Sequence, residues 1–397
     1  MGRARAPSLG RTAAPALRVS WPRSPLLMVS SSSRTGPVEG LISLARELRA
    51  QGLDARFAGD SVRPGEDLGG HLAQAGVPWE AGLRLSRKLR LLDVLHDARL
   101  LTALARQGRH DVLHAAFAHD HSLALWASRR ARNPDLRVVR AAQRRIDVTA
   151  GTLHQRLRAL RRSDGVVVHS ARYQRDLLAL GLDPRRVAYV PAGVDGGWFS
   201  PGAAPELRAS WGIPADAPLA GIVARMKPER GHRDLLHAFA RVEREVPRAW
   251  LVLVGRGEDE KPLRALCREL GLTRAVFGGY LRGPGLLQAY RALDVAVWLR
   301  EGNDGGCRGV LEAMACGVPL VVGDDGAPPE LVGETGVAVP AGDAAAIAGA
   351  LAGLLGDPAR ARELGRAARE RALSFTPRRA ADQTLAFWRR LRDLPPA

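Results

Sequence analysis

The feature that most constrains this chain is the alternation of short apolar runs with longer amphipathic segments. An apolar run at 25–30 ends in a Ser/Gly loop, the segment 39–51 places apolar residues at helical spacing, and another run follows at 54–58. Gly52 stands where a helix stop belongs. Strand, loop, helix and strand in this order predict the start of a doubly wound parallel sheet.

The alternation continues to residue 190, breaks, and resumes at residue 219. In the first half we predict strands at 111–114, 136–139, 165–169 and 187–190, a helix at 121–130, and a helix from an N-cap at Ser170 to Gly181. In the second half we predict strands at 219–223, 250–254, 275–277, 295–298 and 319–322, and helices at 234–245, 261–270 and 309–315.

The break is rich in Pro, Gly and Ala, and an inter-domain linker is placed at its start. A chain of 397 residues is also too long for one ordinary core. The predicted fold class is therefore α/β with two domains. They span 25–190 and 203–376, joined by a linker at 191–202, with a last helix within 377–397.

The composition adds one constraint, a net charge of +18 that is almost entirely arginine. Such a charge favours anionic partners: nucleotide phosphates, acidic glycans or an anionic lipid surface. Arginine, alanine, glycine and leucine dominate the whole chain, which indicates a compositional bias. Basic and aromatic residues do not interleave as they do in single-stranded nucleic-acid binders, so no specific nucleic-acid partner is predicted.

The three cysteines and the amino-terminal segment bear on the compartment. Cys267, Cys307 and Cys316 form no CxxC pair, which argues against a disulfide framework or a cysteine-ligated zinc and fits a reducing cytoplasm. No apolar run approaches the length of a membrane span. Residues 1–24 are rich in Arg and Pro and lack acids, which predicts a disordered tail or a start site set too early.

The strongest motif runs from Glu301 to Pro319, where a strand end leads through a glycine-rich loop into a short helix. Ligands of open α/β sheets bind at the carboxyl ends of strands, beside helix N-termini. Glu312, one turn into the helix, has the geometry to accept two hydrogen bonds from a ribose diol. The backbone amides predicted to face a phosphate or sugar hydroxyls are those of Gly305, Gly306, Cys307 and Arg308.

A second motif lies between 221 and 232, where Arg225 ends a predicted strand and Arg230 precedes a helix. Two guanidinium groups placed this way can clamp a diphosphate through bidentate hydrogen bonds. The histidine-rich stretch 114–121 follows another strand, but no carboxylate-rich partner accompanies it, so no metal site is predicted.

These motifs resemble those of the retaining GT-B glycosyltransferases of family 4. The first is similar to their donor-site pattern E-x7-E followed by A-M-A-x-G-x-P, with Asp304 as the first acid and Glu312 as the second. The alternative first acid, Glu301, requires three inserted residues. The second motif is similar to G-R-x4-K-G with Arg230 in place of Lys, and 191–201 is similar to P-N-G-V-D-x3-F-x-P with Ala192 in place of Asn.

The resemblance implies two Rossmann-like domains facing across a cleft, with the last helix crossing back to the first domain. It implies that Gly36 lies near the donor diphosphate and that Asp304, with His119 or Asp120, lies near the transferred sugar. Arg225, Arg230 and the helix amides then supply the positive charge, so no cofactor or fixed metal is expected.

The implied activity is retaining transfer from a nucleoside-diphosphate sugar to a glycan, lipid-linked or small-molecule hydroxyl. A cytoplasmic location is expected, with peripheral contact at the inner face of an anionic membrane. Two alternatives stay open: another GT-B activity such as a nucleotide-sugar epimerase, or a non-catalytic member that binds a polyanion or glycan.

Overall fold

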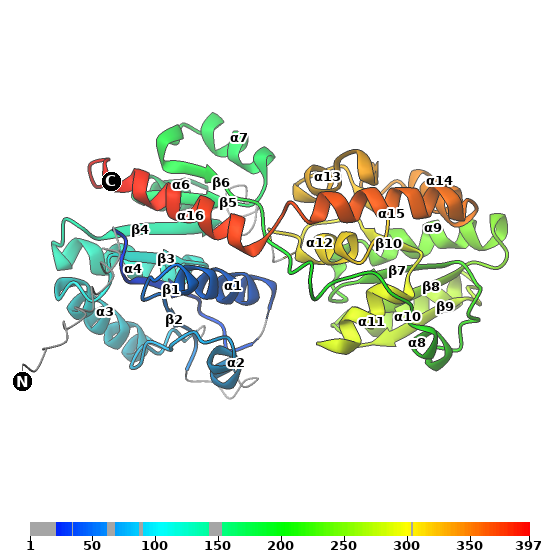
Figure 1. The fold of residues 1–397 in the computed structure, drawn as a ribbon, viewed down its shortest axis with the longest axis horizontal. Coiled ribbons are helices and arrows are strands. Elements are labelled where there is room, and N and C mark those ends of the chain that lie inside the picture. The colour runs from blue at the N-terminus through cyan, green and yellow to red at the C-terminus, as the bar shows by residue number, and fades with distance from the viewer. Residues whose placement is uncertain (1–20, 34, 62–67, 87–89, 143–152, 303–304) are drawn as a thin grey trace, which may run out of the picture.

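The computed structural model describes residues 21–33, 35–61, 68–86, 90–142, 153–302 and 305–397. Two parallel sheets of six strands lie side by side along the long axis of the molecule (Figure 1). The first has the order β2 (Arg56–Ala58), β1 (Pro25–Met28), β3 (Val112–Ala115), β4 (Arg137–Ala142), β5 (Gly165–Val168) and β6 (Val187–Tyr189). The second has the order β12 (Val337–Val339), β11 (Leu320–Gly323), β10 (Val295–Trp298), β7 (Leu219–Val223), β8 (Trp250–Val254) and β9 (Ala275–Gly279).

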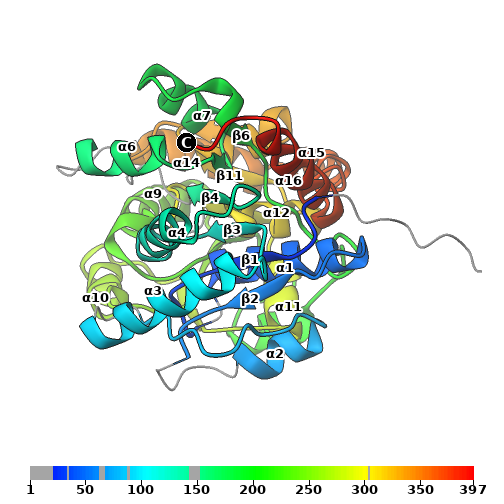
Figure 2. The same ribbon diagram turned by 90° about the vertical axis from the view of Figure 1, so that its left-hand side faces the viewer.

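Helices flank both sheets (Figure 2). Those that follow strands of the first sheet are α1 (Gly36–Ala50), α2 (Leu68–Gln74), α3 (Leu91–Arg106), α4 (Ala118–Ala131), α6 (Leu153–Arg161) and α7 (Ala171–Ala179). Those of the second half are α8 (Pro205–Ser210), α9 (His232–Glu245), α10 (Glu260–Glu269), α11 (Pro284–Ala292), α12 (Arg308–Ala315), α13 (Ala327–Val332), α14 (Ala344–Leu355) and α15 (Pro358–Ala372). The predicted fold class, two Rossmann-like doubly wound units, is confirmed.

The local chemistry of the sequence accounts for these elements. The inner strands are short and largely apolar because helices cover both of their faces, so that β1, β3, β4 and β5 are buried along their whole length. Ser170 caps α7 as predicted, since its hydroxyl accepts a hydrogen bond from the amide of Tyr173 at 3.2 Å. The strands fall on either side of the linker, while the domain limits 25–190 and 203–376 stay a prediction.

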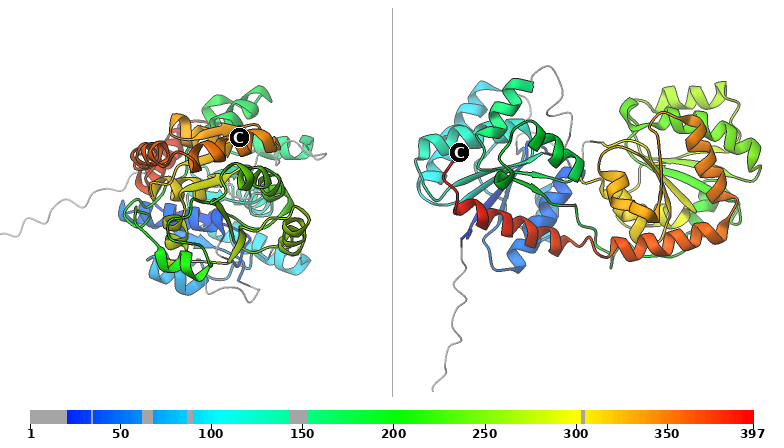
Figure 3. Two further views of the ribbon diagram at one scale, coloured as in Figure 1. Left: turned by 90° about the vertical axis from the view of Figure 1, so that its right-hand side faces the viewer. Right: turned by 90° about the horizontal axis from the view of Figure 1, so that it is seen from above.

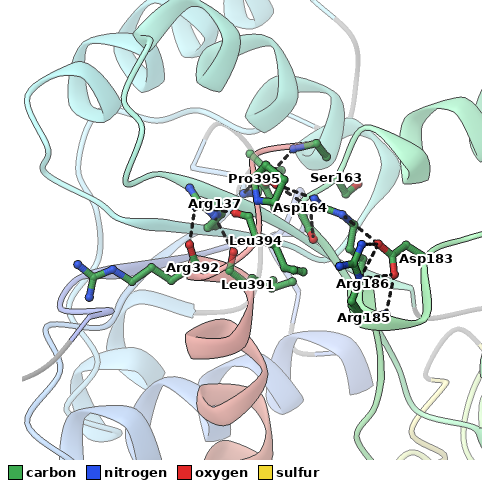
Figure 4. Close-up of polar contacts among 12 residues, drawn as sticks. Arg137, Ser163, Asp164, Asp183, Arg185, Arg186, Leu391, Arg392, Leu394 and Pro395 are labelled. Atoms are coloured by element: carbon green, nitrogen blue, oxygen red, sulfur yellow. Dashed lines mark hydrogen bonds and ion pairs between the residues drawn. The ribbon is translucent and has the colours of Figure 1, made fainter.

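The last helix, α16 (Pro377–Arg392), crosses from the second sheet to the first and packs against α1 (Figure 3). Trp388 lies fully buried in the core of the first sheet. The end of the chain is held by arginines: Arg137 donates to the carbonyls of Leu391 at 3.0 Å and Arg392 at 3.1 Å, and Arg186 donates to Pro395 at 2.6 Å (Figure 4).

Contacts near the linker and farther out join the two halves. The linker passes directly against the start of α16, because a Cβ added to Gly193 would lie 2.5 Å from the backbone nitrogen of Pro377. Farther out, Glu330 of α13 accepts hydrogen bonds from the amides of Ala171 and Arg172, both at 2.7 Å. A carboxylate from the second half thus caps the N-terminus of α7 in the first half.

Candidate active site

A pocket of about 70 Å³ lies between the two sheets. Its lining comes from α1, from the carboxyl ends of β3, β4 and β5, from the linker, from α16 and from the loop before α12. Lining residues from these elements include Gly36, His114, His169, Gly193, Gly306 and Arg308. The carboxyl edge of a parallel sheet is where open α/β folds bind ligands, so this pocket is the candidate active site.

The loop that carries Arg225 is fixed by two glycines of a neighbouring turn. A Cβ added to Gly255, whose φ is 147°, would lie 2.0 Å from the carbonyl oxygen of Ala224, and one added to Gly257 would lie 1.9 Å from that of Met226. Glycine is therefore required for the turns after β7 and β8 to meet. The close packing leaves the Arg225 side chain exposed beyond the end of β7.

Arg230 connects the basic motif to the acidic one. Its guanidinium is buried over the ring of Trp298, 4.5 Å from the ring centroid, at the end of β10. It also packs against the glycine-rich loop, because a Cβ added to Gly302 would lie 1.6 Å from its Nη1. Two motifs far apart in the sequence thus meet at one edge of the second sheet, while their contact with a diphosphate stays a prediction.

Glu312 is held by a residue that the sequence gives no reason to select. The Tyr290 hydroxyl donates a hydrogen bond to Glu312 Oε2 at 2.9 Å, and Arg308 Nη2 lies 3.5 Å from Oε1. Two causes raise the pKa of Tyr290 well above its ordinary value: the larger is complete burial, and the second is the adjacent negative charge of Glu312. The phenol therefore stays protonated and keeps its donor role. No local motif marks Tyr290, which lies 22 residues before Glu312 in the sequence and meets it only in the tertiary fold.

We expect Tyr290→Phe to weaken binding of a nucleoside diphosphate about tenfold, the loss of one hydrogen bond to a charged group. The expected reason is that the buried carboxylate loses the partner that holds it in place for the predicted ribose contact. Calorimetry with the diphosphate and with its 2′,3′-dideoxy analogue checks this, since the analogue lacks the diol that Glu312 is predicted to bind. An equal loss for both ligands would mean that the pair is structural.

Of the two candidates for the first acid of the motif, Asp304 and Glu301, the structure describes only Glu301. Asp304 lies outside the described residues, so its sugar contact stays a prediction. Glu301 is engaged elsewhere: its Oε1 accepts a hydrogen bond from the amide of Ala327 at 2.6 Å, at the start of α13. A Cβ on Gly326 would lie only 2.0 Å from the same oxygen. This engagement favours Asp304 as the acid that faces the sugar.

The rest of the loop leads into α12 through a strained residue. Cys307 has a φ of 45° and a ψ of 47°, the left-handed region that non-glycine residues seldom adopt. Gly305, Gly306 and Cys307 are buried, and Gly306 and Arg308 line the interdomain pocket. The predicted amides thus stand at the N-terminus of α12, beside the pocket.

His119 and Asp120 lie in the first turn of α4, so the prediction that this helix starts at residue 121, after both of them, is wrong. The helix begins at Ala118 because the fully buried Asp120 accepts a hydrogen bond from the amide of Phe117 at 3.0 Å and caps the turn. Burial raises the pKa of Asp120. Neither residue is among those that line the described pocket, and their contact with the sugar stays a prediction.

Two other histidines do line the pocket. His114 is buried at the end of β3, and His169 follows β5, donating from Nδ1 to the carbonyl of Val190 at 2.8 Å. The sequence could have identified both as candidate site residues, because each stands at the carboxyl end of a predicted strand. Gln143 lies outside the described residues. Within the described ranges, no group of three His, Cys, Asp or Glu side chains is arranged to hold a metal ion.

Comparison with known proteins identifies the class. Residues 203–371 match the family of glycosyl transferases group 1, and residues 35–196 match glycosyltransferase family 4. The chain belongs to this glycosyltransferase family, which confirms the GT-B glycosyltransferase expected from the motifs, while retention of anomeric configuration stays a prediction.

Among its relatives, the chain is 34% identical to a GDP-mannose-dependent α-(1-6)-phosphatidylinositol monomannoside mannosyltransferase of Mycolicibacterium smegmatis, over 67% of this chain and 73% of that one. It is 30% identical to a GDP-mannose-dependent α-mannosyltransferase of Mycobacterium tuberculosis, over 78% and 81% of the two chains. Its fold matches that of Anabaena HepE in complex with UDP-glucose, with a TM-score of 0.77, 21% identity and coverage of 91% and 98%.

Proposed function

We propose that this protein transfers mannose from GDP-mannose to the hydroxyl of a lipid-linked acceptor, with retention of anomeric configuration. The observation that carries the proposal is the meeting of Arg230 with Gly302, close to the Tyr290–Glu312 pair, at the carboxyl edge of the second sheet. The names of the two mannosyltransferase relatives support the choice of donor.

In this proposal each group acts on a different part of the donor. Arg225, Arg230 and the amides before α12 neutralise the diphosphate as it departs. Glu312 binds the ribose, and Asp304 orients the mannose. The acceptor oxygen bonds to the anomeric carbon on the face from which the diphosphate leaves. The bond between that carbon and the diphosphate oxygen breaks, and the acceptor proton passes to the released GDP.

Neither a covalent intermediate nor a cofactor is part of the proposal. Two carboxylates near a glycosidic bond do not by themselves define a glycosyl-enzyme. The arginines supply the positive charge that a bound divalent ion would otherwise provide, so the proposed donor complex contains the protein and the nucleotide sugar alone.

The proposal places the reaction in the cytoplasm, with peripheral contact at the inner face of an anionic membrane, because a lipid-linked acceptor lies in a bilayer. Cys267, Cys307 and Cys316 are buried and form no disulfide bond, which is compatible with a reducing compartment. In the described part of the chain, no helix combines the length and apolarity needed to cross a membrane.

The test is a panel of nucleotide sugars incubated with the protein and a total lipid extract. We expect GDP release and a mannosylated lipid from GDP-mannose, and no comparable turnover of GDP-glucose, UDP-glucose or UDP-N-acetylglucosamine. Proton coupling at the anomeric carbon of the product reports the configuration. Preferred use of a UDP sugar, or an inverted product, would contradict the proposal.

A matched pair of variants tests the clamp. Arg225→Ala should weaken GDP binding by about 1.5–3 kcal/mol, the cost of a lost charged hydrogen bond, and leave the thermal midpoint unchanged. Arg241→Ala removes another exposed arginine, from α9, and should leave GDP affinity intact. Unchanged affinity in the Arg225 variant would remove this residue from the site.

A further inference from the structure

The first turns of α3 expose three large aliphatic side chains. Leu91, Leu92 and Leu95 are 72%, 77% and 41% exposed. The other large apolar residues that are exposed in the described part of the chain, Trp198, Tyr280 and Leu373, stand singly and far from one another in sequence. Single exposed apolar residues are ordinary, but three within two turns form a patch that calls for a partner.

The same face of α3 continues into a basic hollow. Helical spacing places Arg99 and Arg106 in line with Leu92 and Leu95, since these positions fall within a narrow angular range on the helix. The hollow between α3 and α4 is lined by Arg99, Arg106, Trp126, Arg129, Arg130 and Arg132, together with small and hydroxyl side chains and no acid.

In the described contacts, the positive charge of this arginine cluster is not paired with a carboxylate. Arg130 stacks over Trp126, 3.8 Å from the ring centroid, and Arg106 donates to the carbonyl of Arg130 at 3.1 Å. The acids of α3 are buried on its other side. There Asp93 accepts from the Arg84 side chain at 2.7 Å, and Asp97 accepts from the Arg84 amide at 2.7 Å.

Helices α3 and α4 run in the same direction, and both begin at the end of the first sheet that faces the interdomain pocket. In a parallel sheet the connecting helices run antiparallel to the strands, so α3, which precedes β3, and α4, which follows it, both start at the carboxyl edge of the sheet. They lie side by side on the outside of the first sheet (Figure 2). The leucines therefore stand at the end nearer the interdomain pocket, and the arginines at the far end.

We propose that this face, the three leucines with the arginine hollow, is the surface by which the protein docks on an anionic lipid bilayer. The leucines enter the interface and the arginines bind phosphate-bearing headgroups. A soluble polyanion would be matched by the arginines alone and would leave the leucines without a role. The assignment rests on the membrane contact of the proposed function and specifies the surface that makes it, with the outer face of α3 and α4 lying along the lipid.

The experiment is flotation of the full chain with vesicles of phosphatidylcholine containing 30% phosphatidylglycerol. We expect wild-type protein to float at low salt and to be largely released by 0.5 M NaCl. The triple variant Arg99→Glu, Arg129→Glu, Arg132→Glu should lose on the order of 100-fold in partitioning. The triple variant Leu91→Ser, Leu92→Ser, Leu95→Ser should also bind more weakly, and pure phosphatidylcholine vesicles should bind none of the proteins.

Matched controls carry the same changes elsewhere. Arg241→Glu, Arg360→Glu, Arg366→Glu reverses three exposed arginines of the second half, and Leu373→Ser removes an exposed leucine beside the linker. Both should float like the wild type, and all variants should keep its GDP affinity. Wild-type flotation by the α3/α4 variants, or equal loss in the controls, would overturn the proposal.

Sedimentation of the same proteins tests whether a second copy of the chain, and not a bilayer, covers this face. A dimer that dissociates in the leucine variant would show that a second copy of the chain covers the face, and would overturn the proposal. Because GDP affinity is measured in parallel, failure of the membrane surface and failure of the proposed donor site give different results.

Discussion

Lowering the pH from 7 to 5 should unfold the part of the chain built on the first sheet before the part built on the second. Burial lowers the pKa of His110 to about 4 and the pKa values of His114 and His121 to about 3, all in the first part. In the second part burial lowers the pKa of His232 to about 4. Each of these groups is neutral in the folded chain at either pH.

The sign follows from where the protons bind. An unfolded histidine titrates near pH 6.5, so below that pH the unfolded chain takes up protons that the folded chain refuses. Stability that is present above pH 6.5 is lost as the pH falls, at about 2 kcal/mol per histidine by pH 5. Three such histidines in the first part, on the order of 6 kcal/mol together, outweigh one in the second.

Buried carboxyls in the same part act in the opposite direction at lower pH. Burial raises their pKa values, so they bind protons in the folded state first and offset part of the loss. These carboxyls are Asp97, Asp111, Asp120 and Asp164. The histidine loss begins as the pH falls through 6.5, and the carboxyls reduce its size as they take up protons.

Hydrogen exchange at pH 7, 6 and 5, corrected for intrinsic rates, resolves the two parts. His114→Leu provides the control, because it replaces a buried titrating ring that packs against Trp388 with a neutral side chain. It should flatten the pH slope of the first part by about 1.4 kcal/mol per pH unit. Earlier unfolding of the second part, or an unchanged slope in this variant, would contradict the expectation.

The strands and their order of appearance were predictable because a parallel strand is buried on both faces and therefore shows as a short apolar run. The runs at 219–223, 250–254 and 295–298 coincide with β7, β8 and β10. The N-cap at Ser170 was equally local, since its hydroxyl and the amide it binds are three residues apart. Features that depend on only a few neighbouring residues could thus be predicted from the sequence.

What the sequence could not supply depends on distant partners or on broken patterns. Helix α3 was missed because Leu91, Leu92 and Leu95 lie on its exposed face and blur the apolar stripe that marks a helix. Helix α4 was predicted to start too late because Asp120 caps it from inside the first turn. The hydrogen bond from Tyr290 to Glu312 depends on tertiary packing and leaves no local pattern.

Turnover numbers should show whether Asp304 or Glu301 is the first acid of the donor-site motif. If Asp304 faces the transferred sugar, Asp304→Asn should keep GDP affinity and lower kcat by about 100- to 1000-fold, as expected when a group that stabilises the transition state is removed. Glu312→Gln should chiefly raise the KM for the donor, because the proposed ribose contact is the same in ground and transition states. Steady-state kinetics on the two variants measures both effects.

Glu301→Gln is the decisive third variant. The Glu301 carboxylate binds the amide of Ala327 at the start of α13, so replacing it with a neutral amide should cost about 1 kcal/mol of stability and change kcat little. Crippled turnover in this variant, with a nearly silent Asp304→Asn, would mean that the loop carries a three-residue insertion and that Glu301 leaves α13 to contact the sugar. The thermal midpoint separates the cases, since a capping role moves it and a purely catalytic role does not.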